Sequence, residues 1–361
     1  MTRASGEKAA KGARQLRSRQ WFDNPDNPGM TALYLERYLN YGLTREELTG
    51  GKPIIGIAQT GSDLSPCNRH HLALAERVRE GIRAAGGIAF EFPLHPIQET
   101  GKRPTAALDR NLAYLGLVEV LYGYPLDGVV LTTGCDKTTP ACLMAAATVN
   151  LPAIVLSGGP MLNGWWKGER CGSGTSVWNA RVEHAAGRIG YEEFIELVAS
   201  SAPSVGHCNT MGTASTMNAL AEALGMSLPG CAAIPAPYRE RAQIAYQTGV
   251  RIVEMVHEDL KPRDILSPGS FQNAAAAVLA VSGSINCIKH LQATAIEAGV
   301  DVDVFQLFND LGEKVPVLSA VAPNGTDTIE AFEAAGGARA LMLQLEPLLC
   351  VDALTVTGKT V

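Results

Sequence analysis

The stretch from Asp127 to Pro160, DGVVLTTGCDKTTPACLMAAATVNLPAIVLSGGP, decides the fold class. It opens with a short β-branched run, Asp127–Thr132, which predicts a buried strand. A helix of small residues is predicted from about Pro140 to Val149, and a second strand, Ala153–Leu156, ends in Ser157-Gly158-Gly159-Pro160. A strand, a helix and a strand in this order are typical of a parallel sheet, because parallel strands need a crossover connection.

The same alternation continues on both sides of this stretch. Upstream, strands are predicted at Pro53–Ala58 and Ile88–Pro93, each followed by a helical pattern, at His71–Ala85 and Thr105–Tyr122. Downstream, the pattern predicts a long ordered loop at Met161–Thr175, helices at Glu192–Ser200, Thr213–Leu224, Ile252–Leu260 (ended by Pro262) and Phe271–Ala280, and a strand near Val315–Val321. The expected fold is therefore α/β and three-layered, with a mostly parallel sheet flanked by helices.

Composition limits the class of protein. Residues 1–50 are expected to form an N-terminal arm and helices, and residues 51–361 one α/β domain. The chain is 46% hydrophobic and 18% charged, which suits a large core and argues against disorder. A net charge of −6 without a long basic stripe argues against nucleic acid as a partner.

The sequence is expected to belong to the cytoplasm, because it carries neither an apolar span nor a secretory signal. No apolar run reaches the roughly 18 residues of a membrane span. The basic N-terminus is not followed by the apolar stretch of a secretory signal. Eight cysteines in such a chain point to thiols in a reducing compartment, with the cytoplasm as the default.

Three of the eight cysteines stand at special places. Cys67 comes shortly after the first strand, Cys135 directly follows the strand Asp127–Thr132, and Cys208 precedes a helix of small residues. Loops at the carboxyl ends of parallel strands converge on a ligand crevice. Soft thiolates bind iron–sulfur clusters, zinc or copper(I), although the wide spacing does not match a CxxC zinc ribbon. Buried core thiols are the alternative interpretation.

Charged residues that could bind a cation lie near these cysteines in the sequence. Asp136 and Lys137 directly follow Cys135, and a carboxylate at a strand end can hold a hard cation such as Mg²⁺. Glu99 follows the second strand and is expected to converge on the same crevice. A solvated acid–base pair in a turn is the alternative for Asp136 and Lys137.

At these residues the sequence resembles the dihydroxy-acid and sugar-acid dehydratase family, most of all its pentonate branch. The matching segments are long: GKPIIGIAQTGSDLSPCN (51–68), RPTAALDRNLAYLGLVE (103–119), residues 131–166 and residues 200–241. The resemblance implies that Cys67, Cys135 and Cys208 hold an iron–sulfur cluster, [2Fe–2S] or alternatively [4Fe–4S]. It also implies that Glu99, Asp136 and Lys137 bind Mg²⁺, with Lys137 carbamylated, because an ammonium cannot ligate a cation.

The family's activity gives the expected function. It is a hydro-lyase that dehydrates a 2,3-dihydroxy sugar acid, D-xylonate first, to a 2-keto-3-deoxy acid. Another aldonic acid, such as L-arabinonate or a hexonate, or a branched-chain dihydroxy acid remains an alternative substrate. The resemblance also implies a homodimer or homotetramer.

Two departures from the family bear on activity. The family's base is expected to be a serine in a C-terminal β-barrel-like domain, and this chain is expected to lack that domain. It would then be inactive alone or paired with a separate C-terminal chain. A non-catalytic or split-enzyme cluster-binding subunit is the alternative. Where the family reads Gly-Gly-Ser-Thr-Asn, this chain has Ser282-Gly283-Ser284-Ile285-Asn286, so a hydroxyl is replaced by the Ile285 side chain.

Other chemically active residues receive ordinary structural interpretations. His207 is a candidate to line the crevice, and Gly172–Thr175 is a weak candidate to cradle a carboxylate with its amides. Trp165 and Trp166 are expected to pack the long loop. Residues expected to be core or surface thiols, or histidines without a role, are Cys142, Cys171, Cys231, Cys287, Cys350, His70, His71, His95, His184, His257 and His290.

Overall fold

A four-stranded parallel sheet forms the centre of the molecule. The computed structural model describes residues 15–98, 102 and 107–361. The strands are β1 (Ile54–Gln59), β2 (Ile88–Pro93), β3 (Gly128–Thr133) and β4 (Ala153–Ser157), in the order β2-β1-β3-β4. All residues of β1, β3 and β4 are buried, which explains their nearly continuous apolar sequences.

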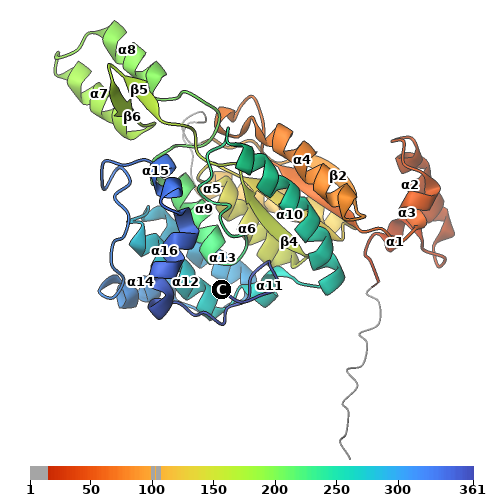
Figure 1. Ribbon diagram of the computed structural model, residues 1–361. Coiled ribbons are helices and arrows are strands. Elements are labelled where there is room, and N and C mark those ends of the chain that lie inside the picture. Colours follow the sequence, from red (N-terminus) through yellow and green to blue (C-terminus); the bar gives the residue numbers. More distant parts are fainter. Residues whose placement is uncertain (1–14, 99–101, 103–106) are drawn as a thin grey trace, which may run out of the picture.

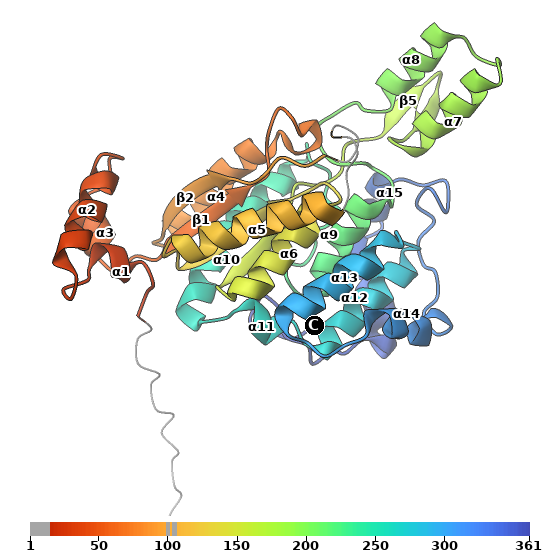
Figure 2. The same cartoon turned by 180° about the vertical axis from the view of Figure 1, so that it is seen from behind.

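Helices cover both faces of this sheet. α4 (His71–Ala84) and α10 (Arg239–Glu258) lie on one face, and α5 (Ala107–Gly123) and α6 (Thr138–Val149) lie on the other (Figures 1 and 2). The predicted three-layer α/β class, with a parallel sheet, is thereby confirmed.

Two glycines let α4 and α10 approach closely. A Cβ added at Gly81 would lie 2.1 Å from the Tyr246 carbonyl oxygen, and one added at Gly249 would lie 2.2 Å from that of Val78. Each helix therefore presents a bare backbone to the other. This explains a glycine in the middle of a 20-residue helix, where it otherwise costs stability.

A second group of helices packs beyond α6. Contacts run from α6 to α9 and α13, and from α12 to α9, α14 and α16. The larger helices of this group are α9 (Thr213–Ala223), α12 (Pro268–Ala280), α13 (Asn286–Ala298), α14 (Val304–Gly312) and α16 (Gly337–Leu345), and the short ones are α11 (Pro262–Ile265), α15 (Ile329–Ala334) and η2 (Glu346–Leu348). In the described part of the chain, no helix is long and apolar enough to cross a bilayer.

Two sequence predictions for the chain after β4 are wrong. Residues 315–321 form no strand; Val321 makes only an isolated bridge to Asp327. The expected loop 161–175 contains an antiparallel hairpin, β5 (Gly164–Trp166) and β6 (Glu169–Cys171). With α7 (Thr175–Ala185) and α8 (Tyr191–Ser200), this hairpin forms a lobe that stands away from the main body (Figure 1).

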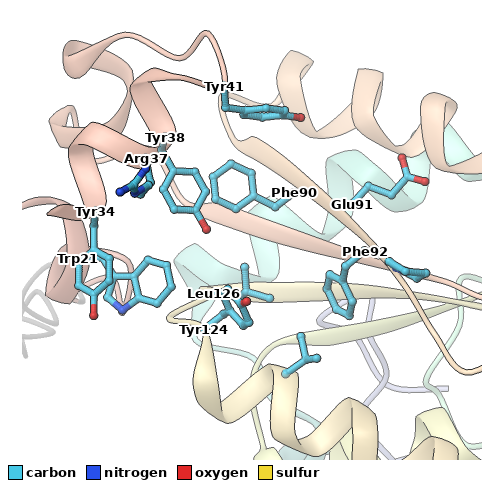
Figure 3. Close-up of a pocket in the computed structure, with 12 residues that line it drawn as sticks. Trp21, Tyr34, Arg37, Tyr38, Tyr41, Phe90, Glu91, Phe92, Tyr124 and Leu126 are labelled. Carbon is cyan, nitrogen blue, oxygen red and sulfur yellow. The ribbon is translucent and has the colours of Figure 1, made fainter.

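The N-terminal helices lie beside the edge strand β2. They are α1 (Arg19–Phe22), α2 (Pro28–Leu39) and α3 (Arg45–Thr49). The ring of Tyr38 stacks on that of Phe90 at 4.9 Å between centroids and an angle of 10°. Around this pair, aromatic residues of the helices and of β2 line a cleft of about 730 Å³ (Figure 3). The buried carboxylate of Asp127 accepts hydrogen bonds from the backbone N–H groups of Ser18 and Ile54, which fixes this segment to the sheet.

Candidate functional site

The strand order creates a crevice between β1 and β3. The chain leaves β1 toward β2 on one side and returns to β3 on the other, so the loops after β1 and β3 diverge. Ligands of open α/β sheets bind at such a switch point, at the carboxyl ends of the strands. Cys67 lies in the loop after β1, in the short helix η1 (Pro66–Asn68), and Cys135 lies in the loop after β3.

Backbone hydrogen bonds bring Cys208 to the same edge of the sheet. The N–H of His207 donates to the Gly159 carbonyl at 3.1 Å, and the N–H of Met161 donates to the His207 carbonyl at 2.9 Å. The segment before Cys208 therefore runs beside the loop that follows β4. The lobe of β5 to α8 intervenes in sequence between these two segments but not in space.

The electrostatics of Cys67 show which groups surround it. Burial raises the pKa of the Cys67 thiol to about 11, and the neighbouring Cys208 thiol and Asp136 carboxylate also raise it. Cys135 Sγ donates to Asp136 Oδ1 at 3.5 Å. The structure thus brings Cys67, Cys208 and the Cys135–Asp136 pair into one neighbourhood.

Asp136 and Lys137 form a buried pair at the start of α6. Lys137 Nζ donates to Asp136 Oδ2 at 2.7 Å, and the two residues are only 8% and 4% exposed, respectively. The solvated-turn alternative is therefore wrong for this pair. Glu99, the third predicted Mg²⁺ ligand, lies outside the described residues. Within the described ranges no three His, Cys, Asp or Glu side chains converge closely enough to hold a single metal ion.

The donor set fits the two groups that the family resemblance implies. Thiolates that approach one another away from water repel, and a cationic cluster between them relieves that repulsion. A buried carboxylate beside them suits a hard cation, and the amino end of α6 favours negative charge at this place. Lys137 fits as a cation ligand only after loss of its positive charge.

Sealed polar residues lie beneath this site. His71 is fully buried, with Nδ1 2.9 Å from Thr60 Oγ1, and its Nε2 is among the enclosed atoms without a partner. His207 is 1% exposed, and its Nε2 accepts from the Asn218 amide at 3.0 Å. Burial lowers the pKa of His207 to about 3. His207 therefore supports the segment before Cys208 from within instead of lining an open crevice.

Arg241 is a buried cation that holds the loop after β4. It is 1% exposed, and its Nη1 donates to the carbonyls of Ser157 at 2.6 Å and Cys231 at 2.8 Å. Its Nη2 donates to the carbonyl of Ile234. A single guanidinium thus ties the end of β4 to the segment before α10.

Sequence reasoning missed three residues of α5 and α13 near the site. Cys287 is fully buried, and burial, followed by the charge of Asp136, raises the pKa of its thiol. His290 lies one helical turn further on, within electrostatic range of both Asp136 and Lys137. Arg110 donates to the ring of His290. The only available signal was the spacing of three between Cys287 and His290, which places both on one face of a helix.

In the segment from Ser282 to Asn286, the Ile285 side chain points outward. Ile285 is 79% exposed. Its neighbours turn inward: Ser284 Oγ lies 2.8 Å from Thr213 Oγ1, and the Asn286 amide donates to the same oxygen at 3.2 Å. The polar contacts of this segment with the start of α9 therefore survive beside the Ile285 side chain.

The chain is similar to proteins of one family along most of its length. Residues 52–361 match the family model described as "Dihydroxy-acid/6-phosphogluconate dehydratase N-terminal". The chain is 63% identical over 351 residues to D-xylonate dehydratase of Caulobacter vibrioides, a match that covers 96% of this chain and 58% of the relative. It is 44% identical to L-arabinonate dehydratase of Rhizobium leguminosarum, covering 98% of this chain and 61% of the relative.

A relative with lower identity is also named as a dehydratase. Dihydroxy-acid dehydratase of Caldanaerobacter subterraneus is 41% identical over 326 residues, which cover 88% of this chain and 58% of that protein. The chain thus spans about three fifths of the length of the curated relatives that it matches.

Proposed function

The chain belongs to the dihydroxy-acid/6-phosphogluconate dehydratase family, and from this premise we propose that it supplies the metal-binding part of a sugar-acid dehydratase. The proposed reaction removes water from a 2,3-dihydroxy acid: the C2 proton and the C3 hydroxyl leave, and the enol becomes a 2-keto-3-deoxy acid. D-Xylonate is the first proposed substrate, because the relative with 63% identity bears that name. The observation that carries the proposal is the meeting of Cys67, Cys208 and Asp136 at one edge of the sheet.

Particular residues are proposed to hold each group. Cys67, Cys135 and Cys208 would bind the iron–sulfur cluster, [2Fe–2S] before [4Fe–4S], and Glu99, Asp136 and carbamylated Lys137 would bind Mg²⁺. When bound, these groups supply Lewis acidity toward the oxygens of the substrate.

The protein's own contribution is position and exclusion of water. Asp136, Lys137, His71 and His207 are all buried, so electrostatic interactions among these groups are less screened than at the surface. The amino end of α6 favours an anionic ligand next to Lys137. We assign the removal of the C2 proton to no residue of this chain.

A substrate panel decides between related acids. Relatives that bear the name of L-arabinonate or L-arabonate dehydratase are 44% and 45% identical, so that pentonate is the second candidate. The measurement is formation of a 2-keto acid from each pentonate, from a hexonate and from a branched-chain dihydroxy acid by the protein that carries this chain. A non-catalytic cluster-binding role would give no keto acid from any of them.

The metal-binding proposal is tested by iron analysis. The chain is purified and reconstituted without oxygen, and its iron, acid-labile sulfide and visible spectrum are recorded. Replacing Cys67, Cys135 or Cys208 by serine is expected to lower bound iron strongly. Cys350→Ser, at a half-buried thiol whose backbone hydrogen-bonds to Asn273 of α12, is expected to retain it. An iron-free, colourless protein after reconstitution would contradict the proposal, as would equal iron loss in the Cys350→Ser control.

We further propose the cytoplasm as the location, in view of the eight cysteines expected to be thiols. A homodimer or homotetramer is proposed from the family resemblance alone.

A further inference from the structure

A buried arginine and a buried histidine meet where α5 and α13 approach the candidate site. Arg110 lies in the first turn of α5 and is 8% exposed, and His290 lies in α13 and is 2% exposed. Arg110 Nη1 lies 3.1 Å from His290 Nδ1. Two further nitrogens of Arg110, Nε and Nη2, donate to the Asn111 side-chain oxygen at 3.1 and 2.9 Å.

This contact fixes the position of the imidazole proton. A guanidinium has only N–H donors, so His290 Nδ1 must accept through its lone pair. Burial lowers the pKa of His290 to about 4, and the positive charges of Arg110 and Lys289 lower it as well. The ring is therefore neutral at pH 7, and its one proton is on Nε2.

The ring is also held in place. Two helical turns beyond His290, Glu297 of α13 accepts from Tyr114 Oη at 2.9 Å and from Thr148 Oγ1 at 2.7 Å. Those residues belong to α5 and α6, so α13 is joined to both helices that flank the site. His290 thus has a fixed backbone on one side and a fixed hydrogen bond on the other.

The second ring nitrogen is available to a ligand. No residue in the described part of the chain bonds to His290 Nε2. His71 Nε2 and Asn68 Oδ1 have no hydrogen-bond partner and are closed off from solvent in that part of the chain. His290 Nε2 is not among such atoms, so it is still accessible. The ring lies within electrostatic range of both Asp136 and Lys137. The neutral N–H donor is therefore carried by α13, which packs on α6, the helix at whose start Asp136 and Lys137 lie.

We propose that His290 is a substrate-binding residue whose Nε2–H donates a hydrogen bond to an oxygen of the aldonate held at Asp136 and Lys137. Arg110 is a positioning residue, because it acts on the substrate only by fixing the tautomer of His290. A donor at this place discriminates strongly among polar substrates, since an acid without the matching oxygen would cover the N–H in the complex and leave it unpaired. This inference rests on the proposed function.

The first experiment reads the tautomer without any substrate. The full-length chain is labelled with ¹⁵N-histidine, and long-range ¹H–¹⁵N spectra are recorded at pH 7, with His290→Asn providing the assignment. The expected pattern is a single neutral tautomer with the proton on Nε2. In Arg110→Met, which offers no donor, a mixture of both tautomers is expected. A proton on Nδ1, a doubly protonated ring, or an unchanged pattern in Arg110→Met would overturn the inference.

The second experiment compares two replacements of His290 that divide its functions. Asparagine keeps an oxygen near the position of Nδ1 and can still accept from Arg110, but it lacks the distal donor. Glutamine places its amide N–H near the position of Nε2. Binding of D-xylonate and L-arabinonate in the presence of Mg²⁺ is measured by calorimetry on the reconstituted protein. We expect His290→Asn to weaken binding about tenfold, and His290→Gln to restore most of that loss.

The outcomes separate the two proposals. His257→Asn, at an exposed position of α10, is the matched control and is expected to bind like the unchanged protein. Equal affinity of His290→Asn and the unchanged protein would overturn the role of His290 while leaving the dehydratase proposal intact. If the unchanged, iron-loaded protein binds no aldonate, the proposed function is wrong, and the role of His290 is wrong with it.

Discussion

Gly158 lies where a single added methyl group should disturb the base of the site. A Cβ built there would be 2.0 Å from His71 Nε2, 2.7 Å from His71 Cδ2 and 3.0 Å from His70 Nε2. Gly158 has no left-handed backbone conformation, so Gly158→Ala tests steric fit alone. His71 cannot turn aside freely, because it is fully buried and hydrogen-bonded to Thr60.

The expected cost has two parts. Forcing an extra methyl into a packed interior costs roughly 1–3 kcal/mol. Moving His71 also breaks a hydrogen bond to Thr60 or Thr132, which adds about 1 kcal/mol. We therefore expect Gly158→Ala to lower the free energy of unfolding by about 2–4 kcal/mol and the thermal midpoint by about 3–5 °C.

Thermal and urea unfolding of the metal-free chain measure this loss. Gly116→Ala is the matched control, because Gly116 is exposed on α5 and an added Cβ meets nothing within 4 Å there. That variant is expected to be neutral or slightly more stable. A midpoint for Gly158→Ala equal to that of Gly116→Ala would refute the steric reasoning.

A double-mutant cycle then identifies the obstacle. His71→Ala removes the ring that the new methyl group would strike. In that background, Gly158→Ala is expected to cost less than in the unchanged protein, since directly contacting residues show non-additive effects. The same penalty in both backgrounds would mean that some other group resists the methyl.

Two further predictions concern buried charges. Burial raises the pKa of Glu222 to about 7, against an ordinary value of 4.5, so the folded state retains a proton that the unfolded state releases. The protonated Glu222 contributes about 3 kcal/mol to the free energy of unfolding, and this contribution is complete below pH 4.5 and is lost as pH rises through 7. Glu222→Gln should therefore flatten the decline of stability with pH in urea titrations. An unchanged pH slope would contradict the raised pKa. Arg241→Lys should cost about 3 kcal/mol, because the three carbonyls accept from two separate nitrogens of a planar guanidinium, a geometry that a single ammonium nitrogen does not reproduce. Exposed Arg239→Lys is the control, and equal thermal midpoints would refute this reasoning.

The strands β1, β3 and β4 were predictable because they are buried on both faces. The runs at β1, β3 and β4 are short, apolar and rich in β-branched residues, and no predicted bound differs from the observed one by more than one residue. The apolar segment 315–321 has the same local character. It nevertheless packs irregularly against the helical layer, with Val315 and Val321 buried but Val317 and Leu318 exposed.

Helix boundaries were harder where packing overrides local pattern. The predicted helix Ile252–Leu260 is the end of a helix that begins at Arg239. The part of this helix before Ile252 is mostly polar and contains Gly249, which weakens a sequence-based prediction but fits the close contact with α4. Pro262 does not end this helix; it occupies the first position of α11, where a proline is well tolerated.

The candidate site was predictable only where its residues follow strands. Cys67, Cys135, Asp136 and Lys137 come from loops whose convergence follows from the rule for parallel sheets. Their assignment as ligands stays a prediction, and Glu99 lies outside the described residues. His290 could not be found in this way, because a single histidine in a helix carries no signal until the fold brings α13 beside α6.

The stacking of Tyr38 on Phe90 has a consequence for how the chain behaves outside its native state. An open strand edge with aromatic side chains is a template for pairing with another molecule. Here α2 stands beside that edge and covers part of Phe90, as a cap does (Figure 3). When these N-terminal helices detach, through mutation or proteolysis, β2 becomes an exposed edge strand that can pair with another molecule. Self-association would then begin at this edge of the sheet.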